Sequence, residues 1–386
     1  MGQHRARAAA LIALLASAMP VSAGAETVVV ALDGKQVRPG DERTGPTRDM
    51  VAVLDIAARP PRVVGSVDAP ATLNGPPVSV AVSRNGKFAL VANSQKLGPD
   101  NKTQPDGVVS LISLADPARP KVLRRLAVDA GAMGVWLDPK GRLALVACAG
   151  ADSIAVLSVR DGETLERVGT IKLEPKSEPR DVIMTPDGRT AYAVRFGDGK
   201  LTRLAINGTT VTRAGDIAVG VNPDGAIISR DGRYLYNTNF GGTPLNTPKT
   251  GAVSIVDLKA GRMVGAVDVG PIPEHVVLSP DGKYLAVVVG NGSAGTRTAA
   301  NFSTVLGKLK VFRTAGDRLL PVAEADTGHN CQGATFSADG RRIFVECAVE
   351  RDITSYDFRD GKLMRAAGDP LVFESRPGAF GSSRGR

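Results

Sequence analysis

The side chains best suited to acid–base or anion-binding chemistry stand at fixed distances from a repeated Asp-Gly or Asn-Gly turn. Seven or eight residues before, or seven after, the turn glycines Gly188, Gly232 and Gly282, the polar residues are Arg180, Asp181, Arg195, Asp224, Asn239, Glu274 and His275. His329 lies in the matching stretch before the next turn. Equivalent positions of repeated units stack around one axis, so we expect these side chains to converge into one candidate ligand site.

Two kinds of chemistry suit this set. Arg180, Glu274 and His275 are the catalytic candidates, because a cluster of Arg, Glu and His can polarise and protonate a small acid or a lactone. If the protein catalyses no reaction, the planar guanidinium groups of the arginines would bind a carboxylate. The carboxylates could also neutralise the arginines and leave no site, or hold Ca²⁺, although no compact acidic motif supports a calcium site. No other cofactor is expected.

The turn that sets these distances occurs six times. SPDGKYLAVV (279–288) recurs as SRNGKFALVA, DPKGRLALVA, TPDGRTAYAV, SRDGRYLYNT and SADGRRIFVE. In Pro280-Asp281-Gly282 the glycine can take a left-handed conformation, which predicts a β-hairpin with a bulge. The strand after it is apolar on both faces, which indicates a sheet covered on both sides.

Each hairpin is followed by two more strand-like runs, so each unit predicts a four-stranded antiparallel sheet. The chain ends carry complementary fragments. Residues 27–32, 51–56 and 62–68 match second, third and fourth strands, whereas 376–382 matches a missing first strand. An all-β, seven-bladed propeller whose seventh blade is shared by both termini accounts for these fragments.

The repeat SPDGKYLAVV, with AVSIVDL and the exposed strand that follows, resembles the YVTN-type seven-bladed propeller family. That family is related to lactonase-like and quinoprotein amine dehydrogenase-like propellers. The resemblance covers residues 27–382 and implies the fold. It implies acidic, basic and His residues near the channel mouth, but a complete catalytic set does not align residue by residue.

The N-terminus has the pattern of an export signal. Arg5 and Arg7 precede an apolar run from Ala8 to Met19, and Ala23-Gly24-Ala25 forms a cleavage pattern. We therefore expect a signal peptide at 1–25 and one propeller domain at 26–386, in a periplasmic or secreted monomer. The apolar run is too short to span a membrane. The formal charge of +9 is scattered, which argues against nucleic acid as a partner.

The chain contains three cysteines, Cys148, Cys331 and Cys347. If the last hairpin turns at Ala338-Asp339-Gly340, residues paired across it sum to 678, and Cys331 and Cys347 satisfy that sum. The predicted export would let this disulfide persist, with Cys148 left as a free thiol. There is no haem-attachment or zinc spacing.

Long connections are expected at 33–49, 93–107, 240–251 and 290–308, all on the face opposite the Asp-Gly turns. Long loops on one rim indicate that this face binds something. The primary interpretation is an exported propeller that binds a small anionic ligand or a periplasmic protein partner through this face. The alternative is a lactonase-type hydrolase with its Arg/His/Glu site at the channel mouth.

Overall fold

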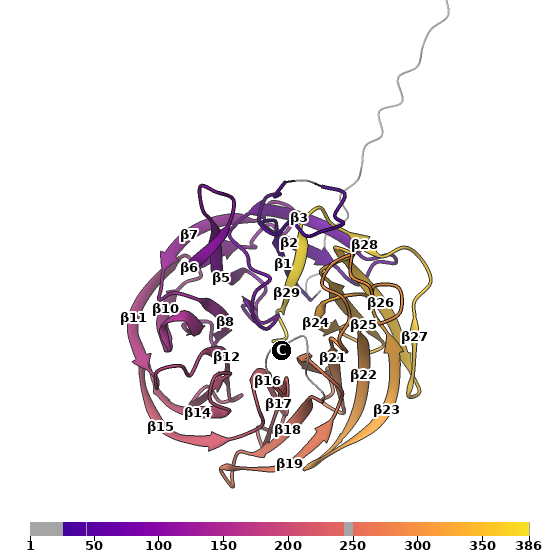
Figure 1. Ribbon diagram of the computed structural model, residues 1–386. Coiled ribbons are helices and arrows are strands. Elements are labelled where there is room, and N and C mark those ends of the chain that lie inside the picture. The colour runs from indigo at the N-terminus through magenta and orange to yellow at the C-terminus, as the bar shows by residue number, and fades with distance from the viewer. Residues whose placement is uncertain (1–25, 44, 243–249, 386) are drawn as a thin grey trace, which may run out of the picture.

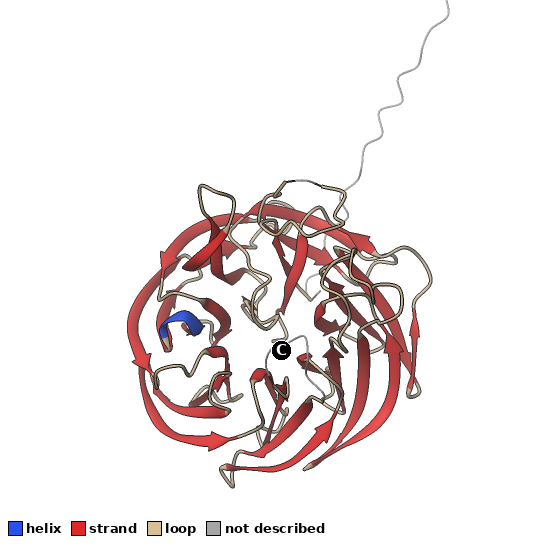
Figure 2. Ribbon diagram, in the orientation of Figure 1, coloured by secondary structure: helices blue, strands red, loops and turns tan. Residues whose placement is uncertain are grey.

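The computed structural model describes residues 26–43, 45–242 and 250–385. Within these ranges, seven antiparallel sheets surround a central axis (Figure 1), and the only helical segment is one turn, η1 (Ala149–Ala151) (Figure 2). The predicted all-β seven-bladed propeller is confirmed. The expected signal peptide lies outside the described residues.

The blades are numbered in chain order, and their strands are given from the axis outward. Blade 1 contains β29 (Arg376–Ser382), β1 (Val28–Asp33), β2 (Met50–Asp55) and β3 (Arg62–Asp68). Blade 2 contains β4 (Val80–Val82), β5 (Phe88–Leu97), β6 (Thr103–Ser113) and β7 (Lys121–Ala127). Blade 3 contains β8 (Ala132–Leu137), β9 (Leu143–Cys148), β10 (Ser153–Arg160) and β11 (Thr164–Lys172).

Blade 4 contains β12 (Pro179–Met184), β13 (Thr190–Arg195), β14 (Lys200–Asn207) and β15 (Thr210–Ala218). Blade 5 contains β16 (Pro223–Ile228), β17 (Tyr234–Asn239), β18 (Ala252–Asp257) and β19 (Arg262–Asp268). Blade 6 contains β20 (Pro273–Leu278), β21 (Tyr284–Val289), β22 (Lys308–Ala315) and β23 (Arg318–Asp326). Blade 7 contains β24 (Cys331–Phe336), β25 (Arg342–Cys347), β26 (Asp352–Arg359) and β27 (Lys362–Arg365), with β28 (Leu371–Val372) also paired to β26.

The repeated turn forms for local reasons. Gly282 has φ 71°, and its N–H donates to the Ser279 carbonyl at 2.8 Å. The Ser279 hydroxyl donates to Asp281 at 2.6 Å, and the same carboxylate accepts from the Lys283 N–H at 3.1 Å. The serine hydroxyl, the aspartate carboxylate and the glycine backbone therefore each stabilise the turn. The residue between serine and aspartate takes part in none of these contacts.

The ring closes through the chain termini, as predicted. β29 pairs antiparallel with β1, in the register Val28↔Ser382 and Ala31↔Ala379 (Figure 1). Every residue of β29 is buried. The innermost strands β29, β4, β8, β12, β16, β20 and β24 contact one another in sequence and line the axis.

One expected loop is largely strand. Within 93–107, β5 and β6 continue as a ribbon in which Gln95 pairs with Pro105 and Lys96 with Gln104. The connections at 33–49 and 290–308 are loops that touch each other, since Arg38 Nη1 donates to Gly295 O at 2.9 Å. Residues 243–249 of the expected loop 240–251 lie outside the described residues.

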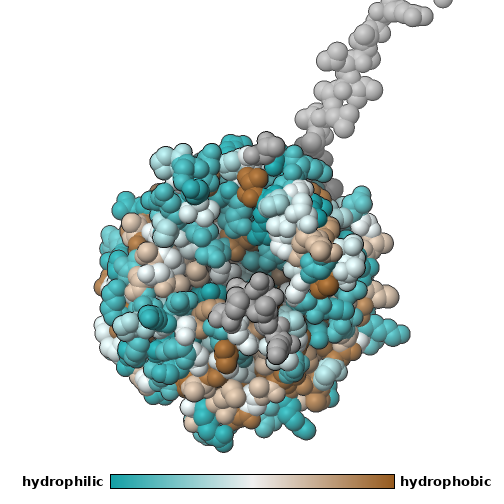
Figure 3. Space-filling view, in the orientation of Figure 1, coloured by the Kyte–Doolittle hydropathy of each residue, from teal (hydrophilic) through white to brown (hydrophobic). Residues whose placement is uncertain are grey.

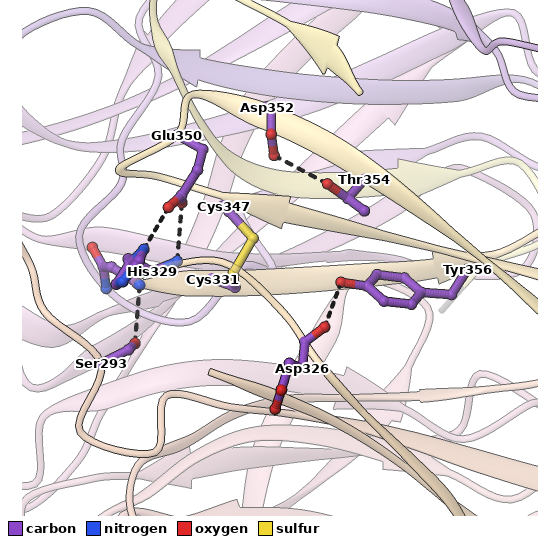
Figure 4. Close-up of a disulfide and its surroundings, with 10 residues drawn as sticks. Ser293, Asp326, His329, Cys331, Cys347, Glu350, Asp352, Thr354 and Tyr356 are labelled. Carbon is purple, nitrogen blue, oxygen red and sulfur yellow. Dashed lines mark hydrogen bonds and ion pairs between the residues drawn. A yellow bond between two sulfur atoms is a disulfide. The ribbon is translucent and has the colours of Figure 1, made fainter. Parts of the chain in front are cut away.

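The predicted disulfide between Cys331 and Cys347 is present (Figure 4). Their pairing is right, although the assumed hairpin register is one residue off. Near the turn, Phe336 pairs with Ile343, a sum of 679, and a bulge between Cys331 and Ala334 restores 678 at the cysteines. Cys148 is free and buried, and burial raises the pKa of its thiol to about 12.

We expect the disulfide to make a measurable contribution to stability. Replacing Cys331 and Cys347 together with alanine should lower the free energy of unfolding by ~3 kcal/mol, because the unfolded chain loses its cross-link. Denaturant unfolding measures the change, with Cys148→Ala as the control for removing a buried sulfur without a cross-link. Peptide mapping that finds free thiols at both bridged positions would contradict the assignment.

Candidate active site

A β-bulge at the start of several inner strands positions the central polar residues. In β12, Pro179 pairs with Arg195 and Asp181 with Val194, so Arg180 is an extra residue with no partner opposite. The same shift occurs in β16, β20 and β24. A bulge re-aims a side chain that a regular strand would hold in the sheet. The bulge residues include Arg180, Asp224 and Glu274.

Arg180 and Asp224 meet across neighbouring blades. Arg180 Nη1 donates to Asp224 Oδ1 at 3.1 Å, and its guanidinium carbon lies 3.3 Å from the centre of the Phe196 ring. The side chain of Asp224 is fully buried, whereas 18% of the Arg180 side chain is exposed. Asp224 and Phe196 therefore hold the guanidinium in place, and part of the Arg180 side chain stays accessible.

Glu274, on the next inner strand, completes a coupled group of charges. Burial, and then the neighbouring Asp224 carboxylate, raise the pKa of Glu274 well above its ordinary value, while Arg180 lowers it. Burial raises the pKa of Asp224 to about 6, and Arg180 opposes that increase. Arg180 is bonded to Asp224, so Asp224 is the carboxylate that ionises first and Glu274 the one that keeps its proton longer. Glu274 is partly exposed.

Asp181 and His275 fasten adjacent blades together. Asp181 Oδ2 accepts from the Ala226 N–H at 3.0 Å, and His275 Nδ1 accepts from the Ala334 N–H at 3.1 Å. Both side chains are buried. An imidazole nitrogen that accepts a hydrogen bond carries no proton, so His275 is neutral with its proton on Nε2. Both residues are placed to position inner strands.

The structure separates Arg195 from Arg180, which corrects the expectation that they converge. The Arg195 guanidinium is fully buried and lies 2.6 Å from Glu174 and 3.0 Å from Asp216, and it also pairs with Asp198. Arg195 is the last residue of β13, which points its side chain toward the outer strands of blade 4. Its charge is neutralised by three carboxylates and is not available to a ligand.

Asn239 also belongs to a structural network. Its side-chain amide donates to Ser254 Oγ at 2.9 Å and accepts from Asn237 at the same distance. The bond to Ser254 joins β17 to β18 within blade 5. Asn239 is buried, and the structure does not bring it to Arg180.

His329 anchors the loop 290–308. Its Nδ1 lies 2.5 Å from Glu350 Oε1, its Nε2 lies 2.6 Å from Phe302 O, and its ring stacks on Phe302 (Figure 4 shows His329 beside Glu350). Both ring nitrogens therefore face acceptor oxygens, which hold the ring in place. His329 lies beside the disulfide (Figure 4) and away from the group formed by Arg180, Asp224 and Glu274.

The segment 71–78, which the sequence interpretation passed over, crosses the channel mouth. A Cβ added at Gly378 in blade 1 would lie 2.9 Å from Thr72 O, and one added at Gly333 in blade 7 would lie 3.0 Å from Pro77. Gly75 packs on Met133 of blade 3. The segment therefore roofs the inner strands at this end. The run Gly75-Pro76-Pro77 before an unusually short inner strand was its sequence signal.

Glu346 is a second residue that sequence reasoning missed. It is fully buried in β25, and neither carboxylate oxygen has a regular hydrogen-bond partner in the described chain. Burial raises the pKa of Glu346 well above its ordinary value of 4.5, and the Gly333 amide offsets only part of this. Six residues after the turn glycine, the other hairpins carry Ala, Val or Thr, and this contrast could have identified it.

Glu346→Gln should stabilise the protein at pH 7–8 by about 1–3 kcal/mol. The raised pKa means that the folded chain holds a proton which the unfolded chain releases. Stability from this group is therefore full below pH 4.5 and falls by ~1.4 kcal/mol per pH unit as the pH rises toward the folded pKa. Glutamine does not titrate, so the variant should not lose this stability as the pH rises. Urea unfolding at pH 5 and pH 8 tests this, and an unchanged pH slope in the variant would contradict it.

The described residues contain no group of three or more His, Cys, Asp and Glu side chains placed to hold a metal ion. In the same part of the chain, no helix is long and apolar enough to cross a membrane. Figure 3 shows one face of the ring, on which polar side chains predominate and apolar side chains form small separate groups. That face offers solvent a mainly polar surface.

A sequence profile described as "Lactonase, 7-bladed beta-propeller" matches residues 41–314. The chain belongs to this lactonase family. The match spans most of the seven blades, including the strands that carry Arg180, Asp224 and Glu274. It stops before β24, so it does not include Glu346.

This lactonase-family propeller is also similar, at low sequence identity, to a curated protein and to several solved structures. A curated relative, Antigen Lp49 of Leptospira interrogans, is 31% identical over 109 residues, which are 28% of this chain and 23% of that protein. A putative 6-phosphogluconolactonase from Bacteroides fragilis has a TM-score of 0.68 at 17% identity, covering 94% of this chain and 99% of that chain. The periplasmic gluconolactonase of Pseudomonas aeruginosa has a TM-score of 0.66 at 18% identity, covering 92% and 98%. At these identities the solved structures establish the shared fold alone.

Proposed function

We propose that this protein hydrolyses a sugar-acid lactone at the end of the channel that carries Arg180 and Glu274. The observation that supports this best is a partly exposed arginine side chain beside a carboxyl group whose pKa is strongly raised. Membership of the lactonase family and the names of two similar structures, a gluconolactonase and a putative 6-phosphogluconolactonase, point to the same class of substrate.

The two side chains supply the groups that the reaction needs. Ionised Glu274 accepts a proton from water, and the water oxygen forms a bond to the lactone carbonyl carbon. Arg180 stabilises the negative charge that develops on the carbonyl oxygen. The ring C–O bond then breaks, and Glu274 returns the proton to the departing ring oxygen. The product is a hydroxy acid, whose new carboxyl group releases one proton to solvent.

The neighbouring residues position this pair. Asp224 and Phe196 fix the guanidinium, and Asp224 also raises the pKa of Glu274 toward the range useful for proton transfer. Asp181 and His275 hold the inner strands in register with their neighbours. His275 therefore acts as a positioning residue in this proposal.

The sequence favoured binding of a small anion without chemistry, and the comparisons favour the hydrolase instead. One experiment separates them. The purified protein is given glucono-1,5-lactone or its 6-phosphate in a pH-stat, and spontaneous hydrolysis is subtracted. Proton release above that background supports the hydrolase. Saturable calorimetric binding of the hydroxy-acid product with no turnover of either lactone would leave a binding protein.

A further inference from the structure

The end of the channel opposite the candidate active site contains a cavity of about 270 Å³. It lies where the inner strands β4, β8, β12, β16 and β29 finish, and its apolar walls include Trp136, Ile183 and Ile228. One water needs only ~10–15 Å³ measured in this way, so the cavity has room for a small molecule. β12 begins at Pro179, beside Arg180, and ends at Met184, so the two ends lie ~16 Å apart at ~3.3 Å per residue.

Three arginines from separate segments surround this cavity: Arg84, Arg230 and Arg384. Arg84 and Arg230 occupy the position between serine and the Asn or Asp of their turns. The other four hairpins have Pro139, Pro186, Pro280 and Ala338 at that position. Turn geometry favours proline there and does not require arginine, so these two side chains need another explanation.

The positive charge at this site is only partly neutralised. Arg384 Nη2 lies 2.6 Å from Glu26 Oε1, and its Nη1 donates to Ser337 O at 3.3 Å. Among the described residues, Arg84 and Arg230 form no ion pair or hydrogen bond. Burial, then Arg384, then Arg84, lower the pKa of Arg230, and Asp281 opposes them with a smaller effect. Asp138 also lines the cavity, so three arginines against Glu26 and Asp138 leave an excess of about one positive charge.

We propose that this cavity binds a small oxyanion, in the form of a phosphate group or a dicarboxylate. The forks of Arg84 and Arg230 would each receive an oxygen pair, which is the geometry that guanidinium groups prefer. The apolar walls with Trp136 would contact any carbon skeleton attached to the anion. This site is separate from the proposed hydrolytic site and goes beyond that function.

Isothermal titration calorimetry with inorganic phosphate and with succinate, at constant ionic strength set by chloride, tests the proposal. We expect saturable binding of at least one probe. Arg84→Ala should raise the Kd of the bound probe by about 10-fold, because one charge-assisted contact is lost. The double variant Arg84→Ala/Arg230→Ala, which loses two such contacts, should raise it by about 100-fold. Phosphate binding alone would indicate a phosphorylated ligand, and succinate binding alone a carboxylic acid.

The matched control is Arg189→Ala/Arg341→Ala, which removes two exposed turn arginines that do not line the cavity. It should leave both Kd values within about twofold. The double variant Arg84→Lys/Arg230→Lys keeps the charge but loses the planar guanidinium, and should bind with intermediate affinity. Equal affinity in wild type and in the Arg84/Arg230 alanine variant, or no saturable binding of either probe, would overturn the proposal. Glu274→Gln should leave this binding intact, which distinguishes this site from the hydrolytic one.

Discussion

Glu274→Gln should reduce kcat/KM for lactone hydrolysis by roughly 10²–10⁴-fold. Glutamine has almost the same shape as glutamate but cannot take a proton from water. The fold should be retained, because the substitution removes an ionisable group whose charged form is disfavoured. The hydrolysis rate in a pH-stat, with the thermal midpoint of the variant measured alongside, provides the test.

The pH profile gives a second readout of the same residue. Glu274 must be ionised to act as the base, so kcat/KM should fall tenfold per pH unit below its raised pKa, at a higher pH than an ordinary glutamate would produce. Glu324→Gln is the matched control, since Glu324 pairs with Lys308 and Lys310 on the outer strands. Its kcat/KM should be unchanged. A Glu274→Gln enzyme with wild-type kcat/KM would show that another group is the base.

Deleting residues 375–386 should remove cooperative folding of the monomer or cost at least about 5 kcal/mol, which is comparable to the whole stability of many domains. The deletion removes β29 and leaves the backbone of β1 as an exposed apolar edge. It also removes Arg376, which is buried and donates to Ala348 O at 2.6 Å, and which pairs with Asp41. Thermal unfolding and size-exclusion chromatography measure the loss of stability and the aggregation.

A shorter truncation that ends at Ser383 is the control for the longer one. It keeps all of β29 and removes only Arg384 to Arg386. Its thermal midpoint should stay within a few degrees of the full chain, although it should weaken anion binding at the opposite cavity. Equal stability of the 375–386 deletion and the full chain would show that the ring does not depend on closure by β29.

Local sequence determined the architecture of this protein. The Ser-x-Asp-Gly turns form through contacts among neighbouring residues, and the apolar strands around them require covered sheets. The complementary end fragments predicted ring closure because only one missing strand could complete the last blade. The Cys331–Cys347 pair followed from its symmetrical placement about a turn, even though a bulge had to compensate for a register error.

The site was predicted only in part, and the reason is geometric. Counting residues from a turn places Arg180 and Arg195 on the same rim, but it cannot show which sheet face a bulged or paired strand presents to the axis. The bulge turns Arg180 toward Asp224 and Glu274. The regular end of β13 instead places Arg195 among three carboxylates, two in blade 4 and one, Glu174, in the connection that precedes it.

Only the tertiary structure could reveal contacts between distant segments. The channel-crossing segment 71–78 is defined by what it touches in blades 1, 3 and 7, and Arg84, Arg230 and Arg384 meet although 300 residues separate the first from the last. Turn and strand propensities depend on a few neighbouring residues, so the sequence reveals them directly. Which charged side chains meet depends on how the seven blades are arranged around one axis, and that arrangement is set by packing between blades.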